Sequence, residues 1–212
     1  KRQLWGGLPL TLFLAVIACL AGVPLGILLA LGRRSSLPLI RILCTGFIEA
    51  VRGVPLITLL FFGAFVLPML VPAQWRVDPM VRIAVCLAAF SAAYLAEVFR
   101  GGLQAVPQGQ VMAAQAMGFT RVQVLRHVVL PQALRVTIAP TVSNFIGAVK
   151  DTSLVAIVNI YDITGSLKMA MSDPHWIAYF VEMYMVVCAV YLLIGLGIAR
   201  YGRFLESRYA LQ

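Results

Sequence analysis

Residues 4–31 are LWGGLPLTLFLAVIACLAGVPLGILLAL, a run without any charged side chain. A helix needs about 20 consecutive apolar residues to cross the roughly 30 Å hydrocarbon core of a bilayer. Pro9 and Pro24 interrupt the run, which membrane helices tolerate when neighbouring groups satisfy the freed backbone. A signal peptide has an apolar core of only about 7–15 residues. This stretch therefore predicts a retained membrane helix that ends before Arg33.

The composition of the whole chain agrees with this. Of its 212 residues, 61% are hydrophobic and 12% are charged, whereas soluble domains carry about 25% charged residues. The formal net charge is +9, but the arginines stand at the ends of apolar runs and form no basic patch beside aromatic residues, so nucleic acid is not an expected partner. The cysteines are isolated in apolar segments and lack zinc-ligand spacing, so no metal site is expected.

Four more apolar runs follow the first, and a shorter helix is expected over residues 39–51. Gly53-Val54-Pro55 breaks that helix before the second run. Together they predict an all-α integral membrane protein with five transmembrane helices in one domain, residues 1–212. The further runs are 56–71, 80–99, 133–149 and 176–199.

Basic residues are unevenly distributed between the connecting segments, which sets the orientation of a membrane protein. The segment after residue 99 and the C-terminus are rich in arginine, so both are expected in the cytoplasm, although Lys1-Arg2 would then lie outside. The basic residues expected inside are Arg33, Arg34, Arg41, Arg100, Arg121, Arg126, Arg135, Arg200, Arg203 and Arg208; those expected outside are Arg76, Arg82 and Lys168.

Residues 109–133, GQVMAAQAMGFTRVQVLRHVVLPQA, are too polar to cross a bilayer. A first helix places Gln110, Ala113, Ala114 and Met117 on one face, and Gly118 suits its C-terminal left-handed position. A Thr-x-x-Gln capping box at 120–123 predicts a second helix, and a proline at 131 suits the first turn of the next one. Small exposed residues permit close approach by a partner protein, or the segment is only a good helix former at the interface.

The same segment resembles the signature loop of ABC-importer permeases, in which Glu-Ala-Ala precedes a glycine and a hydrophobic-Leu-Pro sequence. Ala113-Ala114, Gly118 and residues 129–131 match it, while Met112 occupies the position of the family's glutamate. In the family this loop is the coupling helix that docks on the ATPase. The resemblance implies an ATPase-coupling role, within about 107–131, for Gly109, Gln110, Met112, Ala113, Ala114, Ala116, Met117 and Gly118.

The resemblance extends over the whole chain. GLPLTLFLAV, FIEAVRGVPLI, AYLAEVFRGGLQAVPQGQ, LPQALR and KDTSLV together resemble the polar amino-acid (His/Glu/Gln/general L-amino-acid) branch, and LGILLALGRRS and DPHW resemble the general L-amino-acid permease subunits most. The implied fold is that of a type I ABC importer permease. The implied partners are a second permease in a heterodimer, two ATP-binding subunits and a periplasmic amino-acid-binding protein that docks on loops 72–79 and 160–175.

Charged residues in membrane segments are costly and are functional candidates by default. Glu97 and Arg100 stand three residues apart, as do Glu49 and Arg52, and each pair is close enough to form an ion pair on a helix. Either pair is structural or lines a gate. Glu182 lies in the last span without an obvious local partner.

Lys150-Asp151-Thr152-Ser153 follows the fourth apolar run, where a helix break would expose backbone groups to a water-filled path. In the family this region lies near the gate. The alternative is a self-satisfied Lys-Asp pair with a Thr/Ser cap. The residues expected at the substrate path or gate are Glu97, Arg100, Asn144, Lys150, Asp151, Thr152 and Ser153.

Residues for catalysis are not evident. The chain lacks the G-x-x-x-x-G-K-[ST] motif of ATPases, and His127 and His175 are solitary. We therefore expect neither enzymatic activity nor a cofactor in this chain, with ATP and Mg²⁺ bound by a partner ATPase. The favoured function is the transmembrane subunit of an importer of polar or general L-amino acids in the bacterial inner membrane. The alternatives are an ion-gradient-driven amino-acid transporter, using Glu97, Asp151 and Glu182, and a membrane scaffold.

Overall fold

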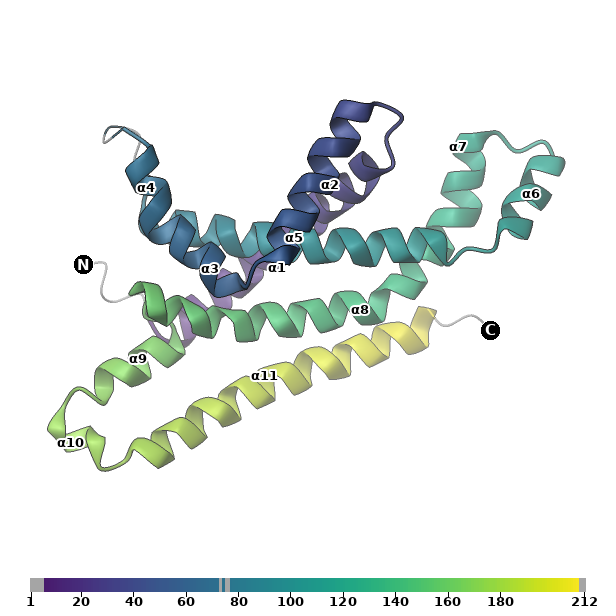
Figure 1. Cartoon of the computed structure of the whole chain (residues 1–212). Coiled ribbons are helices and arrows are strands. Elements are labelled where there is room, and N and C mark those ends of the chain that lie inside the picture. Colours follow the sequence, from purple (N-terminus) through teal and green to yellow (C-terminus); the bar gives the residue numbers. More distant parts are fainter. Residues whose placement is uncertain (1–5, 73, 75–76, 210–212) are drawn as a thin grey trace.

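The computed structural model describes residues 6–72, 74 and 77–209 (Figure 1). Within these residues the protein is helical, and the single isolated bridge joins Gly7 to Asp162. Four helices of the described part are long and apolar enough to cross a membrane, and the number is five if a bent pair of helices is counted as one span. The expected all-α membrane fold is confirmed. Lys1, Arg2, the first two residues of the expected 4–31 helix and Arg76 lie outside the described residues.

Helices α1 (Leu8–Arg33) and α5 (Pro79–Gln104) form the centre of the bundle. Small residues allow their backbones to approach closely, which is how membrane helices gain packing energy without a hydrophobic driving force. A Cβ on Gly26 would lie 2.9 Å from the Leu95 Cβ and 3.1 Å from the Ala92 carbonyl oxygen, and one on Gly22 would lie 2.7 Å from the Ser91 hydroxyl. Residues 22 and 26 thus face 91 and 95, so the two helices run in the same direction.

The second crossing is broken. Helix α2 (Pro38–Gly53) is followed by α3 (Leu56–Phe61), a π-helical turn η2 (Phe62–Val66) and α4 (Leu67–Leu70). The bend between α2 and the α3–α4 segment is 107°, as the Gly53-Val54-Pro55 sequence predicted. Arg82 of α5 donates to two carbonyl oxygens of this π-turn, those of Gly63 and Ala64, each at 2.7 Å.

A helical hairpin connects α5 to the next long helix, α8 (Leu130–Asp151), at one end of the bundle (Figure 1). The hairpin consists of α6 (Gln108–Ala116), α7 (Arg121–Val124) and the π-helical turn η4 (Leu125–Val129). Helix α8 runs antiparallel to α5. A Cβ on Gly102 would meet Ala133 and Thr137, whereas farther along the pair Ser91 donates to Asn144 at 2.9 Å.

The C-terminal third differs from expectation at two points. Helix α8 does not break at Lys150; it continues into a 3-10 turn, η5 (Thr152–Val158), and the chain turns only at Asn159, which is left-handed with φ 61°. After α9 (Ile163–Ala170) and α10 (Pro174–Ile177), the last span α11 (Phe180–Tyr209) begins at Phe180 and not at Trp176. Asp173 and Pro174 start the separate short helix α10, because Asp173 accepts a hydrogen bond from the His175 N–H at 2.9 Å.

Helix α11 lies along α8 and is exposed over most of its surface (Figure 1). Among its described residues only Gly202 is buried, where a Cβ would lie 2.6 Å from a Val142 methyl group. The main apolar core is elsewhere, between α1, α3, α5 and η5. It includes Leu14, Leu60, Ile83 and Val155, all fully buried.

Candidate functional site

Glu97 of α5 is the centre of an ion cluster that joins three helices. Its Oε1 accepts from Arg33 of α1 and lies 3.8 Å from Nη1 of Arg52 in α2, and its Oε2 accepts from Arg100 at 2.6 Å. The Glu97 side chain is 17% exposed, whereas Glu49 on the rim is 56% exposed. The predicted Glu97–Arg100 pair is therefore present, as part of a larger cluster that fixes α1 and α2 to α5.

The predicted Glu49–Arg52 pair is wrong. Oε1 of Glu49 forms an ion pair with Nη2 of Arg33 at 3.0 Å, and Arg52 lies near Glu97 with its guanidinium 5.4 Å from the centre of the Tyr94 ring. Residues three apart on a helix can pair, but a carboxylate pairs with the arginine that the folded chain brings nearest to it. The packing of α1 against α2 supplies Arg33, which sequence spacing within α2 cannot indicate.

The hairpin between α5 and α8 forms as the sequence predicts. Thr120 and Gln123 make a reciprocal capping box at the start of α7, and Gly118 is left-handed with φ 86° just after α6. Gln132 of α8 donates to the Gln110 side chain at 2.5 Å. This contact fixes α6 to the start of α8, so the hairpin is tied to the long helix that follows it.

The expected coupling residues do not share one exposed surface. Ala114 is 1% exposed and faces the interior of the hairpin, where its carbonyl oxygen accepts from the Phe119 N–H at 3.1 Å. Its small side chain therefore serves packing within the hairpin. The remaining expected coupling residues are exposed to solvent: Gly109, Gln110, Met112, Ala113, Ala116, Met117 and Gly118.

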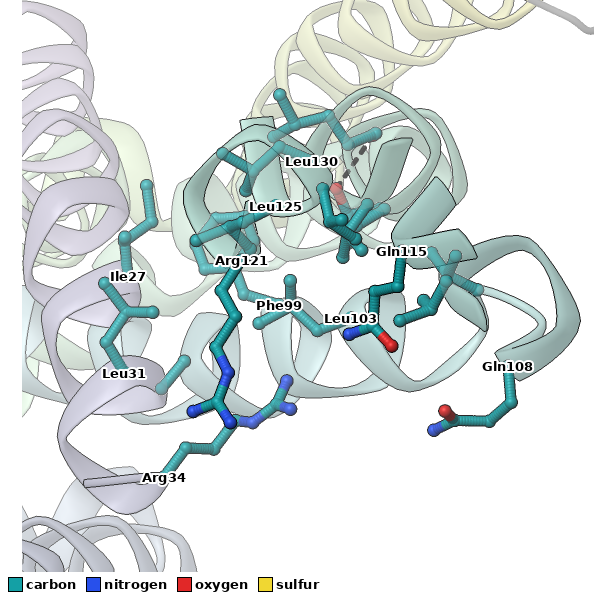
Figure 2. Close-up of a pocket in the computed structure, with 18 residues that line it drawn as sticks. Ile27, Leu31, Arg34, Phe99, Leu103, Gln108, Gln115, Arg121, Leu125 and Leu130 are labelled. Atoms are coloured by element: carbon teal, nitrogen blue, oxygen red, sulfur yellow. Dashed lines mark hydrogen bonds between the residues drawn. The ribbon is translucent and has the colours of Figure 1, made fainter. Parts of the chain in front are cut away.

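A cavity of about 740 Å³ separates the hairpin from the bundle, and we call it the hairpin cavity (Figure 2). The ends of α1 and α5, the hairpin itself and the start of α8 form its walls. Most of its 18 lining residues are apolar. Its polar lining residues are Arg34, Gln108, Gln115, Arg121 and Thr137.

The expected pathway residues between 144 and 153 lie in three separate places. Asn144 and Asp151 face a small cavity against α1 and α5, whereas Lys150 and Ser153 line a groove between α8 and α11. Thr152 is fully buried, and its hydroxyl donates to the Val149 carbonyl at 2.7 Å. Among the described residues no ion pair joins Lys150 to Asp151.

Glu97 and Arg100 lie far from that group. The Ser91–Asn144 hydrogen bond sets the register between α5 and α8. Glu97 is six residues beyond Ser91, and Asp151 is seven residues beyond Asn144 in the opposite direction. At 1.5 Å per residue the two carboxyl-bearing positions are about 20 Å apart along the bundle.

A buried polar network at the opposite end from the hairpin was not predicted. Asp162 is fully buried; its carboxylate accepts from the Gly165 N–H at 2.8 Å and from the Tyr191 hydroxyl of α11 at 3.0 Å. Burial raises the pKa of the Asp162 carboxyl, and these hydrogen bonds oppose that rise. Nearby, Thr11 of α1 accepts from the Ile163 N–H at 3.1 Å. The Asp-Ile-Thr-Gly sequence at 162–165 carries the pattern of a helix N-cap, which was the available signal.

These observations define a multi-pass α-helical membrane protein with a helical hairpin fixed outside its bundle. A family model described as the inner membrane component of binding-protein-dependent transport systems matches residues 22–210, and the chain belongs to this family.

Individual relatives agree with the family. The chain is 44% identical to the inner membrane amino-acid ABC transporter permease protein YhdY of Escherichia coli, over 99% of this chain and 57% of that protein. It is 42% identical to the glutamate/glutamine/aspartate/asparagine transport system permease protein BztC of Rhodobacter capsulatus, over 96% of this chain and 47% of that protein. The chain thus spans about half the length of these two relatives.

A crystal structure of an amino acid ABC transporter with histidines has a chain of the same fold. The TM-score is 0.86 at 30% identity, and the match covers 95% of this chain and 92% of that one. The predicted resemblance to amino-acid ABC permeases and the type I importer fold are therefore confirmed.

Proposed function

We propose that this chain is a transmembrane subunit of an ATP-driven importer that moves polar or general L-amino acids across the bacterial inner membrane. The observation that carries the proposal is the hairpin. A short helix of small and flexible residues is held outside the bundle by the Gln110–Gln132 contact and by two long helices. Such a helix fits a groove on a partner protein and passes its displacement to the helices that hold it.

The partner at the hairpin is an ATPase subunit. Two such subunits bind ATP and Mg²⁺ and carry out the hydrolysis, so this chain contributes no catalytic residue. Met112, in place of the family's glutamate, is 61% exposed. Docking at this position then depends on shape and apolar contact and not on a salt bridge.

A second permease subunit completes the path, as a heterodimer. The open apolar surface of α11 supports this, because an unpartnered subunit leaves large side chains such as Met185, Leu193 and Phe204 exposed. A periplasmic binding protein docks at the opposite end, on loops 72–79 and 160–175. The positive-inside rule places the hairpin and the C-terminus in the cytoplasm.

The substrate path follows the outer half of α8. An amino acid is a zwitterion, so its carboxylate needs hydrogen-bond donors and its ammonium needs acceptors. Lys150 and Ser153 in the groove beside α11, and Asn144 and Asp151 on the α5 side, supply both kinds of group. Glu97 and Arg100 act at the cytoplasmic gate, where they hold α1, α2 and α5 together.

The proposal is tested by ATP hydrolysis of the complete transporter in liposomes. Loaded binding protein should stimulate hydrolysis of the wild type. Ala113→Glu places a charge on the exposed face of α6, and Gly118→Val forces a β-branched residue into a left-handed turn, so both should lower stimulation at least about tenfold, as expected when about 1.4 kcal/mol of coupling is lost.

The matched control is Ala105→Glu, which adds the same charge at an exposed position outside the hairpin. Equal loss in all three variants would contradict a specific role for the hairpin. Uptake that survives ATP depletion but collapses with an uncoupler would instead establish an ion-gradient transporter.

A further inference from the structure

Two arginines at the mouth of the hairpin cavity have no carboxylate to pair with in the described part of the chain. Arg34 follows Arg33, yet only Arg33 joins the Glu97 cluster. Arg121 begins α7 and is exposed. Both line the cavity, and none of its 18 lining residues is acidic. In Figure 2 the two side chains extend towards the same open side of the cavity.

The remainder of the cavity is apolar. Leu31, Leu125 and Leu134 line it, and each is more than 40% exposed although it stands beside the bundle. A volume of about 740 Å³ falls within the range of ligand cavities, about 300–1,000 Å³. An occupant must therefore combine a long apolar part with an anionic group.

The place of the cavity in the fold selects the occupant. It lies at the hairpin end of the bundle, where α1 and α5 end and α8 begins (Figure 1). Since α1 and α5 are each long and apolar enough to cross a membrane, we infer that the bundle leaves the bilayer at this end. The cytoplasmic leaflet is anionic, and basic pockets between transmembrane helices on that side bind lipid head groups. Snorkelling arginines at this level reach phosphates while their stems stay on apolar surface.

We propose that the hairpin cavity binds an anionic phospholipid, with its phosphate between Arg34 and Arg121 and an acyl chain along the leucine wall. The lipid site rests on the proposed function, in which the hairpin lies on the cytoplasmic side of the membrane. The lipid fills the space between the hairpin and the bundle, so it stiffens the connection between α6 and the long helices. Lipid composition would thereby regulate how well the hairpin transmits motion.

The test is a lipid titration of the delipidated transporter complex in detergent, with bound lipids counted by native mass spectrometry. Phosphatidylglycerol should bind more tightly than phosphatidylcholine. Since each basic residue near an anionic lipid surface contributes about fivefold, the R34Q/R121Q double variant should bind phosphatidylglycerol about 25-fold more weakly. The matched control, R41Q/R126Q, removes two exposed arginines that do not line the cavity and should bind normally.

A second pair of variants tests the acyl chain. Leu134→Gln in the cavity wall should weaken retention of phosphatidylglycerol, whereas Leu43→Gln, on an exposed face of α2 outside the cavity, should not. If both arginine variants bind lipid as the wild type does, or if inorganic phosphate displaces the lipid at equal concentration, the proposal is overturned. Loss of the ATPase subunits from R34Q/R121Q with unchanged lipid binding would assign the cavity to the ATPase.

Because the titration involves no ATP hydrolysis, its failure leaves the importer function untouched. Conversely, a transporter that failed the hydrolysis test could still show the charge-selective lipid binding.

Discussion

Glu97 is the acidic side chain at the centre of the ion cluster between α1, α2 and α5. Its carboxylate contacts Arg33, Arg52 and Arg100, and it is far less exposed than Glu49. Removing one partner of a buried ion pair leaves uncompensated charge and typically costs about 3–5 kcal/mol. An exposed pair contributes only about 0–1 kcal/mol.

Glu97→Gln should therefore destabilise the protein by about 1–3 kcal/mol, between the values for an exposed and a buried pair, because the part-buried carboxylate is lost while three arginines stay close together with one rim carboxylate. Glu49→Gln, which removes only the exposed contact to Arg33, should cost less than about 1 kcal/mol. Thermal unfolding of both variants in detergent measures the difference. Equal losses would show that the cluster is a surface pair in the assembled protein.

Asp162 makes the stability depend on pH. Burial raises the pKa of its carboxyl above the ordinary value, which is about 3.9. The folded protein therefore favours the protonated form, so this contribution to stability is complete below about pH 3.9 and is lost as the pH rises through the raised pKa.

Asp162→Asn should remove that part of the pH dependence. Between pH 4 and pH 8 the unfolding temperature of the wild type should fall relative to that of the variant. Asn retains a side-chain oxygen that can accept the Gly165 N–H. A wild-type slope in Asp162→Asn would rule out Asp162 as the titrating group.

Individual contacts were predictable only when both partners lay close in sequence. The Glu97–Arg100 pair and the Thr120–Gln123 capping box follow from spacing of three residues, and both form. Arg33 is 64 residues from Glu97. Only the packing of α1 on α5 brings those two groups together, so no local pattern indicated it.

Among the helices, the α1–α5 contact depends on small residues. On α1 the buried positions Ala18, Gly22, Gly26 and Ala30 recur every four residues, a spacing that places small groups along one face for close backbone approach. This spacing is visible in the sequence, but it does not indicate which helix packs against that face.

Gly26→Val should destabilise the protein by about 1–3 kcal/mol or more, as overpacking of a close contact does. The new Cβ would meet the Ala92 carbonyl oxygen at 3.1 Å and the Ala96 nitrogen at 3.2 Å, and backbone atoms cannot rotate away. Gly46→Val is the control, because a Cβ on Gly46 meets nothing within 4 Å. Unfolding temperature and the amount of folded protein in membranes report the loss.

Helix ends agreed with the sequence prediction where a local residue ends the helix. They differed from it where contacts with other parts of the fold set the helix geometry. Gly118 ends α6 as expected, since a left-handed residue favours glycine. Carbonyl oxygens of the π-turn at Phe62–Val66 accept hydrogen bonds from Arg82, which lies on another helix. After α8, the chain turns at Asn159, later than the polar cluster at Lys150 indicated. Hydropathy alone predicts neither the π-turn nor the position of the turn at Asn159.

Across the whole molecule, the hairpin and the polar groups of the outer half are linked by one rigid pair of helices. Gly102 packs on α8 near the hairpin, and the Ser91–Asn144 hydrogen bond joins the same pair farther along. Under the proposed function, a displacement of α6 would therefore move α5 and α8 together, and Asp151 with them.

This arrangement places the hairpin and the end of α11 at one end of the bundle, and loop 171–173, between α9 and α10, at the other (Figure 1). Under the proposed orientation the first end is cytoplasmic. In a cysteine-free background, Ser172→Cys should react with a membrane-impermeant maleimide on intact spheroplasts, and Ser207→Cys, near the end of α11, only after permeabilisation. Both positions are exposed, so unequal labelling reports the side of the membrane and not burial. The reverse pattern would move the hairpin outside, where no ATPase could reach it, and would remove the basis for coupling to ATP hydrolysis.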